Sequence, residues 1–177
     1  CAVGAPPNTR CRDAAAGRSG TRQQVNTVSS YLDAWNVYGG SEARLEWLRE
    51  GPVDANLANN GPHLLLDADG NLPRRDERGD SSTAPDMALM GRLTGTTDEA
   101  AVAGDVRANE NVALTAIHTL FAREHNRIVD GLPASLGAQR RFDIARRVVM
   151  AEQQYITYRE FLPAVGITLP AYRGYDP

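Results

Sequence analysis

The chain has 177 residues, a hydrophobic content of 42% and a formal net charge of −3, which is enough sequence for one moderate core and predicts a single domain. Its basic residues are all arginines and are interspersed with acids, which excludes the one-sided basic surface of a nucleic-acid-binding protein. No apolar run approaches the ~18 residues of a membrane span, and no N-terminal stretch has the pattern of a signal peptide.

The ends of the chain predict a section of a longer or processed protein, because it starts at Cys1 and stops at Pro177 on an Asp-Pro pair. The absence of lysine suggests a G+C-rich coding sequence, and we take a bacterial source as a hypothesis. Cys1 and Cys11 bracket a Pro/Gly-rich stretch. They form either a short disulfide loop in a secreted protein or two unrelated thiols.

The N-terminal part of the chain predicts one loop followed by one helix. Residues 1–21 are rich in Gly, Pro, Ala and Arg and predict an irregular loop. From Arg22 to Trp35, apolar residues recur with the spacing of an amphipathic helix, which Gly39 and Gly40 stop. These apolar positions are Val25, Val28, Leu32 and Trp35.

The next region predicts one short helix and then little regular structure. Ser41 is the expected N-cap of a helix from Glu42 to Glu50. Residues 53–105 are predicted to be largely loop. Within them, the run D-A-D-G-N from Asp67 to Asn71 resembles a fragment of a calcium loop. It lacks the spaced third ligand and the closing glutamate, so we predict a turn.

Two long helices are predicted in the second half of the chain. The first runs from Val112 to Asp130, with Asn109 or Asn111 as its N-cap and Gly131 after its end. The second runs from Leu136 to Phe161 and would span roughly 40 Å, a length suited to crossing a larger helical domain.

The predicted fold class is therefore mainly α. We expect helices 112–130 and 136–161 to pack against each other, with extended irregular loops elsewhere. Residues 1–177 are predicted to be a single partial domain in which 1–21 and 53–105 are largely loop.

A nine-residue run, A-G-D-V-R-A-N-E-N from Ala103 to Asn111, lies just ahead of the first long helix. That helix contains L-F-A-R-E-H-N-R, and the second contains Y-I-T-Y-R-E-F-L-P. Together these runs resemble the distal-side region of the animal-type haem peroxidases, the myeloperoxidase, lactoperoxidase and peroxidasin superfamily. The resemblance extends from about Arg22 to Pro177. It implies a central section of a longer catalytic domain, whose distal histidine precedes this chain and whose proximal histidine follows it.

The resemblance implies a role for two charged residues in that run. Arg107 corresponds to the arginine that stabilises the negative charge leaving on a peroxide oxygen, a role suited to a permanent cation with fixed donors. Glu110 corresponds to a glutamate that can be ester-linked to haem b. Without the resemblance, Arg107 would be a helix-end contact and Glu110 a carboxylate favoured by the helix dipole. Asn111 replaces the methionine of myeloperoxidase-like sites, which makes chloride oxidation a less expected activity.

The histidines are not expected to bind iron. His118 and His125 lie seven residues apart on the first long helix, and the corresponding family histidines are not iron ligands. We predict that both are packed or hydrogen-bonded in the core. His63 lies in irregular sequence, and we predict no supporting partner for it.

The run S-S-Y-L-D-A-W-N-V-Y-G from Ser29 resembles the calcium loop of the family. The resemblance implies Ser29, Tyr31 and Asp33 as calcium ligands, because calcium prefers oxygen donors. Trp35 stands where the fourth ligand would be and has no side-chain oxygen. Calcium binding is thus expected only with an incomplete ligand set, with Asp33 the strongest candidate.

The expected function is part of a haem peroxidase that oxidises halide, pseudohalide or phenolic donors with hydrogen peroxide, in a secreted protein and with a role in the oxidative stress response. Its partners would be hydrogen peroxide, small reducing substrates and the remainder of its own domain, with no nucleic acid and no membrane. Two alternatives stay open: a fatty-acid oxygenase of the cyclooxygenase and dioxygenase branch, and a non-catalytic helical module. Because both family histidines lie elsewhere, residues 1–177 alone are expected to be inactive.

Overall fold

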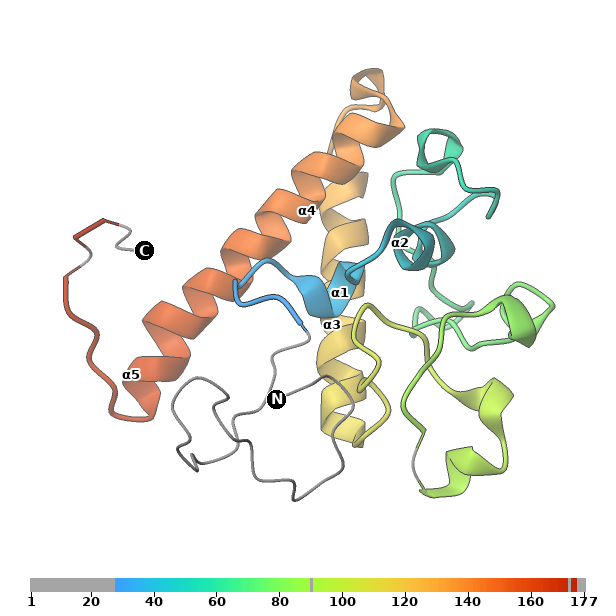
Figure 1. Cartoon of the computed structure of the whole chain (residues 1–177). Coiled ribbons are helices and arrows are strands. Elements are labelled where there is room, and N and C mark those ends of the chain that lie inside the picture. Colours follow the sequence, from blue (N-terminus) through green and yellow to red (C-terminus); the bar gives the residue numbers. More distant parts are fainter. Residues whose placement is uncertain (1–27, 90, 172, 175–177) are drawn as a thin grey trace, which may run out of the picture. The chain divides into compact units, whose positions relative to one another are not determined.

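The computed structural model describes residues 28–89, 91–171 and 173–174 (Figure 1). It divides into two compact units, Cys1–Ser30 and Tyr31–Pro177, and the elements below belong to the second. The α-helices are α1 (Trp35–Tyr38), α2 (Glu42–Leu48), α3 (Val112–Asp130), α4 (Ala138–Tyr155) and α5 (Leu162–Ala164). A π-helical turn, Ile156–Phe161, links α4 to α5. Single 3₁₀ turns occupy Leu57–Asn59, Ser81–Thr83, Gly91–Thr94, Thr97–Glu99 and Ala134–Leu136.

The mainly α prediction is confirmed. Among the described residues, β-pairing is limited to two isolated bridges, Arg49 with Leu64 and Arg74 with Ala101. In the same part of the chain, no helix is both long and apolar enough to span a membrane.

Helices α3 and α4 pack against each other, as predicted, and run antiparallel as a hairpin (Figure 1). At the start of α3, the Asn111 side-chain oxygen accepts a hydrogen bond from the Leu114 N–H at 2.9 Å. At its end, the Gly131 N–H reaches the carbonyl groups of Arg127 and Ile128, at 3.3 and 3.1 Å. These contacts satisfy backbone groups that a helix end leaves open. The two helices meet at the loop that joins them and diverge toward α5 (Figure 1).

The second long helix differs from its prediction at both ends. It begins at Ala138, because Gly137 has a φ of 73°, outside the right-handed helical region. Beyond Tyr155 the helical path continues through the π turn and passes Pro163 to end at Ala164. Proline lacks an N–H and its ring clashes with the carbonyl group four residues earlier in an α-helix, so a wider turn before Pro163 removes that conflict.

The core lies where the hairpin meets α1 and α2. Phe142 of α4 is buried and contacts two other rings edge-on or tilted, Tyr38 at 5.8 Å and His125 at 4.9 Å between centroids. The guanidinium of Arg49 covers the Phe142 ring at 4.1 Å. Buried hydrophobic residues from several elements complete the core: Val37, Trp47, Leu48, Leu64, Val102, Ala122, Val129, Ala145 and Val149.

Side-chain hydrogen bonds to the backbone hold the long loop in place of regular structure. The buried carboxylate of Glu46 accepts hydrogen bonds from the N–H groups of Asp54 and Asn56, at 3.0 and 2.9 Å. Arg78 donates to the carbonyl groups of Trp47 and Gly51, at 3.0 and 2.8 Å. The loop is therefore irregular in backbone conformation but fixed in position.

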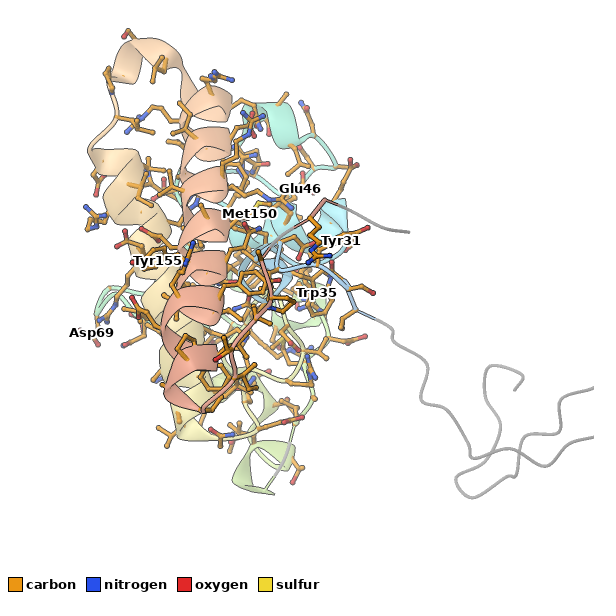
Figure 2. The ribbon with its side chains drawn as sticks, turned by 90° about the vertical axis from the view of Figure 1, so that its left-hand side faces the viewer. Tyr31, Trp35, Glu46, Asp69, Met150 and Tyr155 are labelled. Atoms are coloured by element: carbon orange, nitrogen blue, oxygen red, sulfur yellow. The ribbon has the colours of Figure 1, made fainter. Side chains whose placement is uncertain are left out.

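The run from Asp67 to Asn71 is a turn, as predicted. The Asp67 carboxylate accepts hydrogen bonds from the N–H groups of Asp69 and Asn71, at 2.9 and 2.7 Å. These hydrogen bonds lower the pKa of Asp67, and the bond from the Asn71 N–H contributes most. Asp69 points outward at the edge of the molecule (Figure 2).

The helix predicted from Arg22 to Trp35 is wrong in its described part. Residues 28–34 form bends, and the helix at this place is α1, which only begins at Trp35. The cause is local: Ala34 is in the left-handed conformation, with φ 57°, and the Asp33 carboxylate accepts the Trp35 N–H at 3.1 Å. Aspartate uses this bond to start a turn in place of a continuing helix. Residues 22–27 of that prediction, and Cys1 and Cys11, lie outside the described residues.

Candidate functional site

The run from Ala103 to Asn111 is seated on the backbone of α1. The N–H of Asp105 donates to the carbonyl oxygen of Asn36 at 3.1 Å. A Cβ atom on Gly104 would lie 2.5 Å from the Gly39 nitrogen and 2.6 Å from the Trp35 carbonyl oxygen. Both neighbours are backbone atoms, so only glycine permits this approach.

Arg107 is held by one carboxylate. Asp105 Oδ1 accepts hydrogen bonds from the Arg107 backbone N–H and from Nε, both at 2.9 Å. Asp105 Oδ2 accepts from Arg107 Nη2 at 2.6 Å. The Asp105 side chain is 9% exposed and the Arg107 side chain is 52% exposed. The pair thus joins a buried anion to a cation at the surface.

Each member of the pair favours the ionised form of the other, as their pKa values show. Burial by itself would raise the pKa of Asp105, but the hydrogen bonds and charge of Arg107, together with the nearby His118, lower it overall. The hydrogen bond and charge of Asp105 raise the pKa of Arg107 further above its ordinary value, with a smaller contribution from Glu110. Arg107 is therefore a cation throughout the physiological pH range.

Glu110 lies on the same turn as Arg107. Its N–H donates to the Arg107 carbonyl oxygen at 2.9 Å, and its side chain is exposed. The described residues show no ion pair to its carboxylate. The turn thus presents one cation and one carboxylate together at the surface, immediately before α3.

Two side chains brace this turn from behind. The Asn109 amide exchanges two hydrogen bonds with the backbone of Ala101, at 3.0 and 2.8 Å. The Thr115 hydroxyl donates to the Ala108 carbonyl oxygen at 2.6 Å. Of the two predicted capping residues, Asn111 is the N-cap of α3, whereas Asn109 holds the preceding turn to Ala101. Arg107 and Glu110 are exposed on a well-anchored segment.

His118 and His125 are core residues, as predicted. His118 is 3% exposed, with Nδ1 2.7 Å from the Leu114 carbonyl oxygen. His125 is fully buried, with Nδ1 2.9 Å from the Tyr38 hydroxyl and Nε2 3.0 Å from the Pro62 carbonyl oxygen. Burial lowers the pKa of His125 to about 4, so the ring is neutral at physiological pH.

The prediction that His63 has no partner is wrong. Its two ring nitrogens lie 3.1 Å from a Glu50 oxygen and 2.9 Å from an Asp130 oxygen. Both partners are distant along the chain, so local sequence carried no signal for them. Asp130 is the last residue of α3, about 27 Å along the helix axis from its first residue, so His63 lies far from Arg107.

The predicted calcium residues are distributed over both compact units. Ser29 belongs to the first, whereas Tyr31 and Asp33 belong to the second. The Asp33 carboxylate accepts the Trp35 N–H, and Tyr31 is exposed. The described residues contain no group of three or more His, Cys, Asp or Glu side chains arranged to hold a metal ion. Calcium binding stays a prediction.

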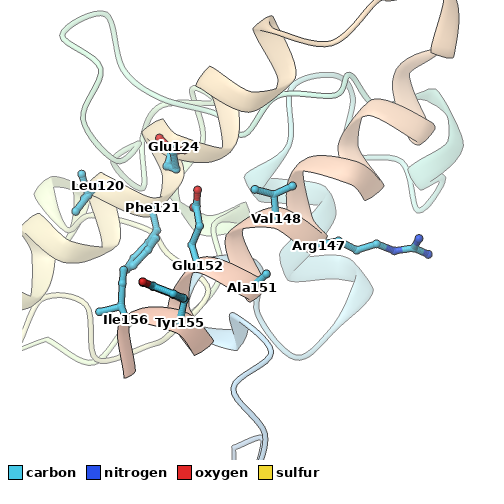
Figure 3. A pocket seen from close by; sticks show the side chains of 9 residues that line it. All are labelled: Leu120, Phe121, Glu124, Arg147, Val148, Ala151, Glu152, Tyr155 and Ile156. Atoms are coloured by element: carbon cyan, nitrogen blue, oxygen red, sulfur yellow. The ribbon is translucent and has the colours of Figure 1, made fainter. Parts of the chain in front are cut away.

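A largely apolar groove of about 720 Å³ opens between the diverging helices α3 and α4 (Figure 3). Glu124 of α3 and Glu152 of α4 face each other across it, and Arg147 points away from the other lining residues (Figure 3). Burial, and then the charge of Glu124, raise the pKa of Glu152. Four of the lining side chains are large, apolar or aromatic and exposed: Leu120, Val148, Tyr155 and Ile156.

Comparison with known sequences gives the class of this helical domain. Residues 5–177 match the sequence model of the animal haem peroxidase domain. Peroxidasin homolog pxn-1 of Caenorhabditis elegans is 32% identical over 88% of this chain. Thyroid peroxidase and a peroxidasin homolog, both of Homo sapiens, are each 36% identical over 88% of the chain. The chain belongs to the animal haem peroxidase family.

The chain is short compared with these relatives. The matched region covers 12% of the Caenorhabditis elegans protein, 17% of thyroid peroxidase and 10% of the human peroxidasin homolog. Activity, substrates and partners of the complete protein are therefore proposals.

The residues present fit one side of a haem site. Arg107 and Glu110 supply a cation and a carboxylate on one anchored, exposed turn. An iron ligand is absent from this turn: His118 and His125 are enclosed in the core, and His63 is at the far end of α3. The match of Arg107 and Glu110 to the distal side of the family's haem site stays a prediction, and the described residues supply no axial histidine.

Proposed function

We propose that this chain forms the distal side of the haem site in a hydrogen-peroxide-dependent oxidoreductase. The observation that carries the proposal is the Arg107 guanidinium, held on one edge by Asp105 and exposed on the other, with Glu110 on the same turn. Membership of the animal haem peroxidase family supports it.

Bound haem would supply the iron at which hydrogen peroxide is reduced. Arg107 would stabilise the negative charge that develops on the departing oxygen, because its guanidinium stays charged and its donors need no reorganisation. A base must also move a proton between the peroxide oxygens. His118 and His125 are buried in the core, so we assign that base to a histidine outside residues 1–177.

The same assignment predicts that residues 1–177 alone are inactive even when haem is supplied. The loss of an acid–base group by itself typically slows a reaction ~10²–10⁴-fold. Turnover of guaiacol by the purified chain at the rate of a complete peroxidase would contradict this prediction.

Glu110 is the proposed point of attachment to haem b, through an ester with a haem methyl group. Its exposure and its position one turn from Arg107 support the assignment. Asn111 caps α3 and has no sulfur, so the second link of myeloperoxidase-like sites is not available at this position. We infer halide, pseudohalide or phenolic donors as reducing substrates, with chloride the least favoured.

The apolar groove between α3 and α4 is an argument for a structural partner of this chain. We propose that this partner is the remainder of the same domain. Large exposed apolar side chains on two long helices are unusual for a free surface. A fatty-acid oxygenase is the second candidate function, but an exposed Glu110 suited to an ester and the peroxidase names of the relatives favour the peroxidase. Secretion remains a prediction.

The test uses the full-length, haem-loaded protein with Arg107→Ala and Glu110→Gln. Arg107→Ala should keep its haem and react with peroxide about 10²–10³-fold more slowly, because it loses a donor at a developing charge. Glu110→Gln should stay folded, release haem more readily into acidified organic solvent and shift the Soret band. Stopped-flow absorbance and haem extraction measure the two effects.

Arg140→Ala is the matched control, because Arg140 is an exposed arginine on α4. It should change neither the rate nor haem retention. If Arg107→Ala reacts with peroxide as fast as the parent, Arg107 is only a helix-end contact, and the non-catalytic helical module becomes the better description.

A further inference from the structure

Three hydrogen bonds connect Arg107 to Asp105, and they restrict more than the position of the charge. The backbone N–H, Nε and Nη2 are all directed at the same carboxylate. An exposed arginine otherwise samples many rotamers, and its conformational entropy opposes any fixed orientation. Two-point pairing of a carboxylate with the guanidinium edge fixes the plane of the group. Within the described residues, Nη1 makes no hydrogen bond and is left available.

The carboxylate is itself rigidly placed. The Asp105 N–H is bonded to the Asn36 carbonyl oxygen, and Gly104 is in backbone contact with α1. The Asp105 side chain is almost fully buried, whereas its partner is half exposed. The position of the Arg107 guanidinium therefore depends on α1 through Asp105, and not on the flexibility of its own side chain.

Such a pair is a poor device for stability. Removing a carboxylate from water has a large cost, and a half-exposed arginine returns only part of it through a screened interaction. A carboxylate next to the cation also weakens the positive potential that a leaving peroxide oxygen would experience. The arrangement makes physical sense if the orientation of the guanidinium matters more than its net charge.

We propose that Asp105 is a positioning residue for the peroxide reaction. Its buried carboxylate holds the Nε–Nη2 edge of Arg107 so that the remaining N–H groups face the bound peroxide. This inference rests on the proposed function of Arg107. It predicts that neutralising Asp105 slows the reaction with peroxide, whereas an argument from charge alone predicts no slowing.

Asp105→Asn removes a negative charge beside the cation. If only charge mattered, the variant of the full-length, haem-loaded protein would react with peroxide as fast as the parent or faster. We expect a reaction slower by about 10–10²-fold, the cost of a small misplacement of a catalytic group. The measurement is the second-order rate constant for the Soret change after mixing with hydrogen peroxide.

A double-mutant cycle separates positioning from a structural role. In the Arg107→Ala background, Asp105→Asn should cause no further loss, because no guanidinium remains to be oriented. An equal loss in both backgrounds would show that Asp105 acts through the fold, and the inference would fail. A parent-like rate for Arg107→Ala by itself would instead refute the proposed function.

Glu46→Gln is the matched control for removing a buried carboxylate. Glu46 is 4% exposed and accepts two backbone hydrogen bonds in another part of the loop. Its peroxide rate should equal that of the parent. A Glu46→Gln rate as slow as that of Asp105→Asn would overturn the inference, because any loosened loop would then suffice.

Arg107→Lys tests the inference without touching the buried carboxylate, should Asp105→Asn fail to fold. Lysine keeps the charge but has no planar edge that a carboxylate can hold at two points. We expect it to react with peroxide within about threefold of Arg107→Ala, a tolerance set by the ordinary scatter of such effects. A rate restored to that of the parent would show that charge is sufficient and would overturn the role of Asp105.

Discussion

The two ends of α3 use polar residues in opposite ways. Toward its C-terminal end, His125 is fully enclosed and both ring nitrogens have partners, the Tyr38 hydroxyl and the Pro62 carbonyl oxygen. Just before its N-terminal end, Arg107 and Glu110 are exposed, although the turn that carries them is firmly anchored. A buried polar group with every bond made serves the fold. A polar group held in place with donors left available is suited to a ligand.

The side chains at the two ends of α3 are also fixed in position by different kinds of contact. Around His125, apolar packing and ring contacts with Phe142 and Tyr38 fix the side chains. Around Arg107, a glycine contact with the α1 backbone and a buried carboxylate do so. Substitutions at the first end should therefore lower the free energy of unfolding, and substitutions at the second should mainly alter the reaction with peroxide.

Phe142→Ala should have the largest effect on stability. Phe142 is 1% exposed and contacts Tyr38, His125 and Arg49, so its loss leaves a cavity. Truncation of a buried phenylalanine typically costs about 3–5 kcal/mol. Urea unfolding of the full-length protein measures the loss, and the peroxide rate of the remaining folded protein should be unchanged. A loss under ~1 kcal/mol would mean that this core does not support the hairpin.

Acidification should destabilise the same end through His125. Its pKa is about 4 in the folded protein, against the ordinary 6.5. Between these values the unfolded chain takes up a proton that the folded one excludes. The stabilisation is therefore present above pH ~6.5 and is lost as the pH falls toward 4, at most about 1.4 kcal/mol per pH unit.

The comparison for this prediction is His125→Gln, which cannot titrate in this range. Unfolding free energies measured from pH 7 to 4 should fall more steeply for the parent than for the variant, by about 3 kcal/mol in total. Parallel pH profiles would show that His125 is protonated in the folded protein as easily as in the unfolded one.

Gly104→Ala should affect both properties, because it links the site to α1. The added methyl would lie within 2.6 Å of backbone atoms, so the segment must move. We expect a loss of about 1–3 kcal/mol in stability, typical of overpacking, and a slower peroxide reaction as Asp105 shifts. Gly131→Ala is the control, since its methyl would meet nothing closer than 3.5 Å. A normal rate for Gly104→Ala would argue against the link.

Asn111→Ala should have the smallest effect. It removes the side-chain cap from the Leu114 N–H, a change that typically costs ~1 kcal/mol. Thermal unfolding should show this modest loss while the peroxide rate stays within about twofold of the parent. A much slower reaction would mean that the start of α3, and not only the turn before it, is needed for positioning Arg107.

The long helices could be predicted because their signals are local. The apolar spacing of 112–130, its capping residue Asn111 and the terminating Gly131 are all contiguous in the chain. The core placement of His118 and His125 was predicted from the family resemblance, in which neither histidine binds iron, and both are buried. The helix predicted through residues 28–34 does not form, although its apolar residues recur with helical spacing. That spacing could not reveal that Ala34 takes a left-handed conformation and that the Asp33 carboxylate starts a new turn.

For the candidate site, Arg107 and Glu110 were predicted from the resemblance of the run Ala103–Asn111 to the family's distal-side segment, because their residue types alone favoured a helix-end contact. The sequence also indicated the family. Only the tertiary structure decided that Asp105 is buried, that Gly104 touches α1, and that His63 is bound between Glu50 and Asp130. The two contacts of His63 join residues 13 and 67 positions apart, and Gly104 meets a part of α1 more than 60 positions earlier in the chain. Their formation depends on how the whole chain packs, which no local pattern specifies.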